Sequence, residues 1–180
     1  MDNIEIPGVK IIKLNLRSDN RGYTFKPFSR KEIDEIGLKF EVKEIFYSSS
    51  SKNVIRGMHF QLPSYTQAKV IHVMKGRIMD VILDLRNDSP TFGQYISLEL
   101  KEGDGKVLYI PKGLAHGFAS LVEGSTVLYL FDSPYSTKHE GGVRYDSFGF
   151  KWKVDRPMLS SRDLSFPEFN KFRSPFRLLE

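Results

Sequence analysis

The stretch KVIHVMKGRIMDVILDLR, residues 69–86, contains two apolar runs joined by the turn Lys75-Gly76. Short apolar runs separated by turn residues are typical of antiparallel strands. Apolar character is unbroken through the centre of this pair, which indicates that both faces of its strands are partly sheltered. The pattern therefore predicts a small sandwich or barrel with a filled, partly polar interior.

Similar runs lie on both sides of this pair. They are GVKIIKLNL (8–16), VIRGMHFQ (54–61), GQYISLELKEGDGKVLYI (93–110) and STVLYLF (125–131), and the turns among them are Gly103-Asp104-Gly105 and Glu123-Gly124-Ser125. Helical signals are few: SRKEIDEIG (29–37) begins with a Ser cap and ends in Gly, and SSRDLSFPEF (160–169) allows one more turn. We predict one all-β domain over residues 1–180 with a few short helices.

The composition excludes several functions. The 180 residues include no cysteine, which rules out thiolate catalysis, disulfides and thiolate metal sites. The formal net charge is +5, but basic and acidic residues are interspersed and form no basic tract, so a small anionic ligand is favoured over nucleic acid. The sequence shows no signal-like start and no apolar run near the roughly 18 residues of a membrane span. We expect a soluble, cytoplasmic protein that binds neither nucleic acid nor membrane.

Two histidines, His59 and His116, lie inside apolar, strand-like runs. A lone histidine at such a position is usually a hydrogen-bonded core residue. In this chain, however, Gly105, Pro111, Gly113 and His116 spell G-x5-P-x-G-x2-H, which matches the second sequence motif of the cupin superfamily. In a small barrel, alternate side chains point inward, so both histidines are candidates for the lining of a ligand cavity.

The metal ligands of many cupins are incomplete in this sequence. A metal-binding cupin also needs a first motif with an H-x-H pair and a glutamate, whereas residues 59–61 read His-Phe-Gln and supply one imidazole. A complete octahedral or tetrahedral ligand set cannot be assembled from them. We expect a metal-free cupin-type antiparallel jelly-roll barrel, with a metal-dependent oxygenase or isomerase as an alternative.

A set of further motifs sharpens the interpretation. In order and spacing, the sequence resembles the dTDP-4-dehydrorhamnose 3,5-epimerase family over nearly its whole length. The motifs that carry the resemblance are DNRGYTFKPF (19–28), SSKNVIRGMHFQ (50–61), QAKV (67–70), DLRNDSPTFGQY (84–95), IPKGLAHGF (110–118), VLYLF (127–131) and LSSRD (159–163). The resemblance implies a cofactor-independent isomerase, and a homodimer in which N-terminal strands pair with the partner's sheet.

The resemblance also implies catalytic roles for four residues. Epimerisation beside a ketone requires a base that removes the proton from C3 or C5, a group that stabilises the enolate oxygen, and an acid on the opposite face. His59 matches the base and Asp163 the carboxylate that orients it. Tyr129 matches the acid and Lys69 the cation near the oxyanion. From the sequence alone, Tyr129 can also be a core aromatic residue and Asp163 a helix cap.

Six further residues are expected to bind the substrate, a sugar linked to a nucleoside diphosphate. Arg21 and Arg56 match groups that hold the diphosphate, for which a guanidinium is well shaped. The other four are His116, Tyr135, Gln61 and Glu44. We expect His116 to bond the sugar or to support Lys69, Tyr135 to form a wall of the nucleotide site and Glu44 to contact the base.

The expected base-binding region departs from the family it resembles. Lys26, Glu44 and Phe46 stand where these enzymes typically carry Glu, Gln and Asn. A carboxylate such as Glu44 can accept two hydrogen bonds from guanine, whereas thymine has one ring N–H. This difference predicts a GDP-linked 4-keto sugar, a hexose or a heptose, that feeds surface polysaccharide synthesis. The alternatives are the standard dTDP-4-dehydrorhamnose 3,5-epimerase, an epimerase of C3 or C5 alone, and a sugar-binding cupin without turnover.

Overall fold

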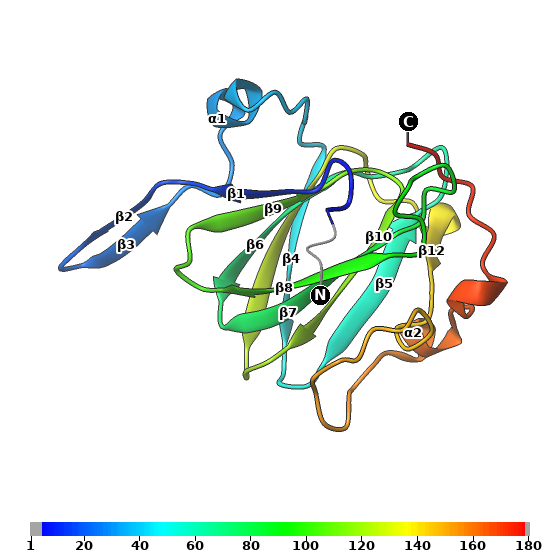
Figure 1. The fold of residues 1–180 in the computed structure, drawn as a ribbon. Helices are drawn as coiled ribbons and strands as arrows, with labels where there is room; N and C mark the ends of the chain where they lie inside the picture. Colours follow the sequence, from blue (N-terminus) through cyan, green and yellow to red (C-terminus); the bar gives the residue numbers. More distant parts are fainter. Residues whose placement is uncertain (1–4, 179–180) are drawn as a thin grey trace.

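The structure, a computed structural model, describes residues 5–178. Two five-stranded antiparallel sheets pack face to face (Figure 1). The first sheet consists, in spatial order, of β1 (Lys10–Lys13), β9 (Lys106–Ile110), β6 (Lys69–Lys75), β11 (Ser125–Phe131) and β4 (Glu44–Ser50). The second consists of β12 (Glu140–Gly142), β5 (Ile55–Gln61), β10 (Leu114–Ser120), β7 (Arg77–Asp84) and β8 (Tyr95–Lys101).

Successive strands mostly alternate between the sheets, which is the connectivity of a jelly roll. The predicted all-β cupin-type jelly roll is therefore confirmed, and so are the strand pair over residues 69–86 and both short helices, α1 (Arg30–Glu35) and α2 (Ser161–Ser165). The structure adds two single-turn 3-10 helices, η1 (Thr137–His139) and η2 (Phe169–Lys171). No helix within residues 5–178 is long and apolar enough to span a membrane.

The space between the sheets is divided into an apolar part and a polar part. Large aliphatic and aromatic side chains fill the apolar part, among them Ile71, Ile82, Leu108 and Phe118, all of which are fully buried. Burial of such side chains removes apolar surface from water and is the main driving force for folding. The polar part lies where Lys69, Asp80 and His116 point between the same sheets.

A hairpin formed by β2 (Leu16–Asp19) and β3 (Gly22–Phe25) extends away from the two sheets (Figure 1). The sequence did not predict it as a separate element. Most of its side chains are exposed. An isolated two-stranded hairpin is only marginally stable in water, so this extension is a candidate for contact with another surface.

A β-bulge interrupts the pairing of β5 with β10. His116 pairs with His59, but Phe118 pairs with Arg56, so β5 has one residue more than β10 in this interval. The extra residue shifts the alternation of side chains, and Arg56 and His59 therefore face the same side although they are three positions apart. Gly57 occupies the bulge with φ +142°, a conformation that favours glycine.

We predict that Gly57→Ala destabilises the protein more than Gly124→Ala does. A Cβ on Gly57 would lie 2.5 Å from the Gly117 Cα and would also adopt a positive φ, whereas a Cβ on Gly124 meets nothing within 4 Å and is strained by its φ of +70° alone. Left-handed strain costs about 1–2 kcal/mol and steric overpacking about 1–3 kcal/mol more. Urea unfolding of both variants measures the difference, and equal losses in the free energy of unfolding would show that the close approach is not a constraint.

Candidate active site

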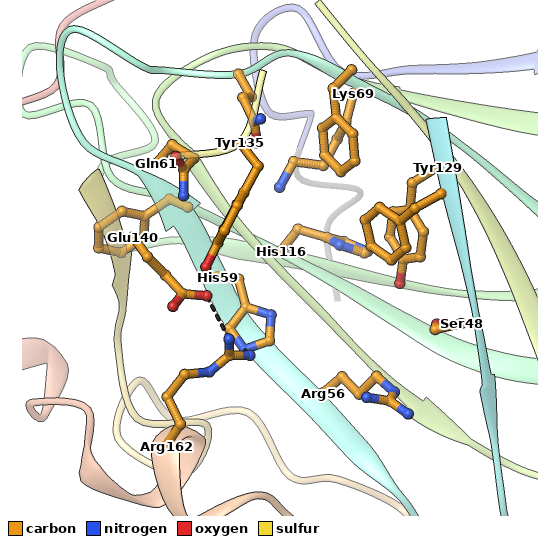
Figure 2. A pocket seen from close by; sticks show the side chains of 14 residues that line it. Ser48, Arg56, His59, Gln61, Lys69, His116, Tyr129, Tyr135, Glu140 and Arg162 are labelled. Atoms are coloured by element: carbon orange, nitrogen blue, oxygen red, sulfur yellow. Dashed lines mark hydrogen bonds and ion pairs between the residues drawn. The ribbon is translucent and has the colours of Figure 1, made fainter. Parts of the chain in front are cut away.

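A cavity of about 260 Å³ opens between the two sheets (Figure 2). The second sheet contributes His59 and Arg56 from β5 and His116 from β10. The first contributes Lys69 from β6 and Tyr129 from β11. These five predicted residues come from distant parts of the sequence, and the fold places all of them around one space.

His59 is held on one wall by the carboxylate of Asp163. His59 Nε2 lies 2.9 Å from Asp163 Oδ1, and Asp163 Oδ2 accepts a hydrogen bond from the Gly57 backbone N–H at 3.1 Å. Burial tends to raise the pKa of Asp163, but the His59 ring, the Gly57 N–H and the Ser160 hydroxyl outweigh it, so the pKa falls well below 3.8. Asp163 is therefore ionised and accepts the Nε2–H of His59, which leaves Nδ1 as the ring nitrogen free to accept a proton.

The position of Asp163 depends on α2. Ser160 is the N-cap of this helix, and its hydroxyl accepts a hydrogen bond from the Asp163 backbone N–H at 3.1 Å. Asp163 thus lies in the first turn of α2, which Ser160 caps. The Asp163 side chain does not cap the helix but points toward His59. The expected pairing of Asp163 with His59 is present.

Two residues beside this pair were missed by the sequence-based predictions. Arg162 donates from Nε to Asp163 Oδ1 at 3.2 Å, and its Nη1 pairs with the carboxylate of Glu140. Its Nη2 also lies 3.3 Å from His59 Nε2. The only sequence signal for Arg162 was its place in the LSSRD motif. Glu140 had no sequence signal, because the strand that carries it, β12, was not predicted.

Lys69 and His116 line the deep part of the cavity (Figure 2). Burial lowers the pKa of the Lys69 ammonium to about 8, and the negative charge of Asp80 opposes part of this effect. Burial also lowers the pKa of His116, against the influence of Asp80, so this imidazole is neutral at pH 7 and its Nε2–H donates to Asp80 Oδ2 at 2.8 Å. The Asp80 Oδ1 atom is buried and forms no hydrogen bond to any residue in the range 5–178.

Tyr129 lies on the wall opposite His59 (Figure 2). The residue is 6% exposed, and burial followed by the charge of Asp80 raises the pKa of its hydroxyl, so the phenol keeps its proton throughout the neutral range. The hydroxyl points toward Ser48 (Figure 2), but Ser48 Oγ has no hydrogen-bond partner within the described chain. The cavity thus has an imidazole on one wall, a protonated phenol on the other and an ammonium group between the same sheets.

The remaining predicted residues divide into those in the cavity and those outside it. Gln61 and Tyr135 line the cavity. Gln61 Oε1 is occupied by the Ser136 backbone N–H at 2.9 Å. Glu44 does not line the cavity. Its Oε2 accepts a hydrogen bond from the Tyr135 backbone N–H at 2.8 Å. Arg21 lies on the projecting β2–β3 hairpin, where it pairs with Asp19, and is not in the cavity of its own chain.

Comparisons with known proteins give one consistent result. Residues 3–171 match the model of a family described as dTDP-4-dehydrorhamnose 3,5-epimerase. A protein of that name from Shigella flexneri is 35% identical over 168 residues, which cover 92% of this chain and 93% of the relative. One from Mycolicibacterium smegmatis is 37% identical and covers 91% of this chain and 83% of the relative.

Solved structures agree with the sequence relatives. The dTDP-4-dehydrorhamnose 3,5-epimerase of Bacillus anthracis, solved with TDP and PPi bound, superposes with a TM-score of 0.87 at 35% identity, covering 91% of this chain and 98% of that chain. The dTDP-6-deoxy-D-glucose-3,5-epimerase of Legionella pneumophila, solved with dTDP-4-keto-L-rhamnose, gives 0.89 at 31% identity, covering 95% and 93%.

The match spans both sheets, the cavity between them and helix α2 with Asp163, and several relatives exceed 30% identity over most of both chains. The chain therefore belongs to the dTDP-4-dehydrorhamnose 3,5-epimerase family of isomerases.

Proposed function

We propose that the protein inverts C3 and C5 of a dTDP-linked 4-keto-6-deoxy sugar, as a dTDP-4-dehydrorhamnose 3,5-epimerase. The observation that carries this proposal is the position of the hydrogen-bonded His59–Asp163 pair across the cavity from the protonated Tyr129 (Figure 2). Inversion at a carbon requires proton removal from one face and proton return to the other, and a base and an acid on opposite walls supply both.

In this mechanism, His59 Nδ1 removes the proton on the carbon next to the C4 ketone. The positive charge that forms on the ring is stabilised by the Asp163 carboxylate, which also fixes the tautomer. The electrons of the broken C–H bond move to the C4 oxygen and form an enolate. The Lys69 ammonium, which carries most of its charge at pH 7, stabilises that oxygen electrostatically in a buried site.

Tyr129 then delivers its hydroxyl proton to the opposite face of the same carbon. The C4 carbonyl re-forms as the enolate electrons return to make the new C–H bond. The Tyr129 phenolate then takes up a proton from solvent and His59 releases one. The same two proton transfers follow at the second carbon. The neutral His116, whose Nε2–H is held by Asp80, accepts a hydrogen bond from a sugar hydroxyl through Nδ1.

We infer that the active form is a homodimer. Strand β4 lies at the edge of its sheet, and Ile45 and Tyr47 on it are 60% and 67% exposed. An exposed sheet edge with apolar side chains is a natural template for a strand from another chain. The projecting β2–β3 hairpin can supply such a contact and bring Arg21 to the diphosphate bound by the partner subunit, while Arg56 binds the diphosphate of its own cavity.

We propose a dTDP-linked sugar in place of the GDP-linked sugar that the sequence led us to expect. The relatives named above are dTDP-sugar enzymes, and two of the solved structures hold TDP or a dTDP-sugar. Glu44, on which the guanine prediction was based, does not line the cavity, and its Oε2 accepts a hydrogen bond from the Tyr135 backbone N–H. Glu44 therefore gives the guanine prediction no support within the cavity.

The test of the function is incubation with dTDP-4-keto-6-deoxyglucose in deuterated water, with NMR detection at each carbon. Wild-type protein should incorporate deuterium at C3 and C5, and His59→Ala should lower both rates by about 10²- to 10⁴-fold, the usual contribution of a positioned base. His72→Gln is the matched control because His72 is bonded to the Lys106 carbonyl outside the cavity. Deuterium at one carbon only would make the protein a single-carbon epimerase, and unchanged exchange in His59→Ala would remove His59 from the role.

The pH profile tests the role of Lys69. Because burial lowers the pKa of Lys69 from 10.5 to about 8, the ammonium loses its proton as the pH rises through about 8. If it stabilises the enolate, kcat/KM should fall about tenfold per pH unit above that value. The pKa of Tyr129 is raised above 10, so its ionisation does not cause a fall in kcat/KM near pH 8. The residual activity of Tyr129→Phe should therefore show the same fall at alkaline pH. A profile that stays flat to pH 10 would exclude the ammonium from the reaction.

Calorimetric titration tests the nucleotide. We expect dTDP to bind more tightly than GDP, by about 5- to 150-fold if one polar partner is left unmade with guanine. Arg21→Ala should weaken both nucleotides by about tenfold without changing their ratio, because a guanidinium on the diphosphate does not distinguish bases. Tighter binding of GDP would restore the guanine prediction. Unaltered affinity in Arg21→Ala would contradict the proposal that Arg21 binds the diphosphate in the cavity of the partner subunit.

A further inference from the structure

Three aromatic rings form a parallel stack on the Tyr129 side of the cavity. The Phe46 ring lies 4.6 Å from the Tyr129 ring at an interplanar angle of 11°, and 5.6 Å from the Phe131 ring, also at 11°. Tyr129 and Phe131 are themselves within 1° of parallel. All three residues line the cavity, and Phe46 is the cross-strand neighbour of Tyr129 in the pairing of β4 with β11.

The two proposed proton-transfer groups are held in place by different kinds of contact. His59 is oriented by a hydrogen bond to Asp163, whose carboxylate is itself bonded to the Gly57 N–H. Tyr129 has a weaker support: burial raises the pKa of its phenol, and the nearby Ser48 hydroxyl opposes this in part as a polar partner, but Ser48 Oγ forms no hydrogen bond of normal geometry within residues 5–178. The orientation of the phenol therefore depends on what packs against the faces and edge of its ring.

Among those packing groups, Phe46 has the shortest ring-to-ring distance to Tyr129. Both residues line the cavity, and Phe46 is 44% exposed whereas Tyr129 is 6% exposed. His116 meets the Tyr129 ring only in a T-shaped contact at 6.1 Å. Stacked pairs contribute beyond the area that they bury, so loss of the Phe46 ring frees the phenol to tilt and admits water beside it.

We propose that Phe46 is a positioning residue for the acid, which holds Tyr129 at the angle required to protonate the enolate on the face opposite His59. This inference rests on the proposed function. It concerns a side chain at which this sequence departs from the asparagine typical of the family it resembles, so it is specific to this chain.

The enolate can be protonated on either of two faces, and the position of Tyr129 decides which. When Tyr129 is in place, its proton goes to the opposite face and inverted product forms. When Tyr129 is displaced, the enolate persists until His59 returns a proton to the original face, and the substrate is recovered unchanged in configuration. His59 has a 29% exposed side chain and exchanges its proton with solvent, so that recovered substrate carries deuterium.

The experiment measures this partition in Phe46→Asn, with the dTDP-4-keto sugar in deuterated water. We expect product formation to fall roughly 10- to 100-fold, as for other small misplacements of a catalytic group, while deuterium incorporation into recovered substrate falls less than threefold. KM should stay within threefold of wild type. Phe46→Tyr keeps the flat ring and should restore the wild-type partition, and Phe46→Leu should be intermediate.

Controls separate this inference from the other claims. Phe92→Asn removes a ring of similar exposure, 43%, that packs on Phe169 outside the cavity, and it should leave the partition unchanged. If KM rises while the partition stays constant, Phe46 binds substrate and does not position the acid, and the inference is wrong. Equal losses of exchange and product would also overturn it. A wild-type protein that forms neither product nor exchanged substrate would instead reject the proposed function itself.

Discussion

The close approach of Gly57 to Gly117 is the constraint on which the site depends. These two glycines let β5 and β10 meet at the bulge, where a Cβ on Gly117 would lie 2.8 Å from the Arg56 carbonyl oxygen and 3.0 Å from the Gly57 Cα. The bulge turns Arg56 and His59 to the same side, and it leaves the Gly57 N–H unused by the sheet, so that it can bind Asp163. One local irregularity thus places a cation and an imidazole on the cavity wall and supplies the N–H that holds the carboxylate bonded to that imidazole.

The polar interior is accommodated at a cost in stability. Lys69, Asp80 and His116 are all buried, and one oxygen of Asp80 has no partner among the described residues. Ionised groups are expensive to bury, and the lowered pKa of Lys69 expresses that cost. The apolar packing at Ile71, Ile82 and Phe118 offsets it. Electrostatic groups that are fixed before the substrate arrives need no reorganisation during the reaction, which is the reason to retain them.

Much of the architecture was predictable because strand period and turn residues are local signals. The runs that became β6, β7, β8, β9 and β11 are all marked by glycine-containing turns, and the family motifs identified His59, Lys69, Tyr129 and Asp163 together. The bulge was not predictable, since the register of two strands depends on contacts between residues about sixty positions apart. Glu140 was missed because a three-residue strand carries no periodicity. The guanine prediction is unsupported because it relied on the residue type of Glu44 alone, and the sequence does not reveal that this side chain lies outside the cavity and binds the Tyr135 backbone N–H.

The carboxylate that orients His59 lies on α2, beyond the last strand of either sheet. During synthesis, all strands of both sheets leave the ribosome before Asp163 does. A nascent chain at that stage has its complete set of strands and the imidazole on β5, but not the partner that selects the tautomer. The order of translation therefore separates the synthesis of the barrel strands from the synthesis of the carboxylate that holds the His59 ring.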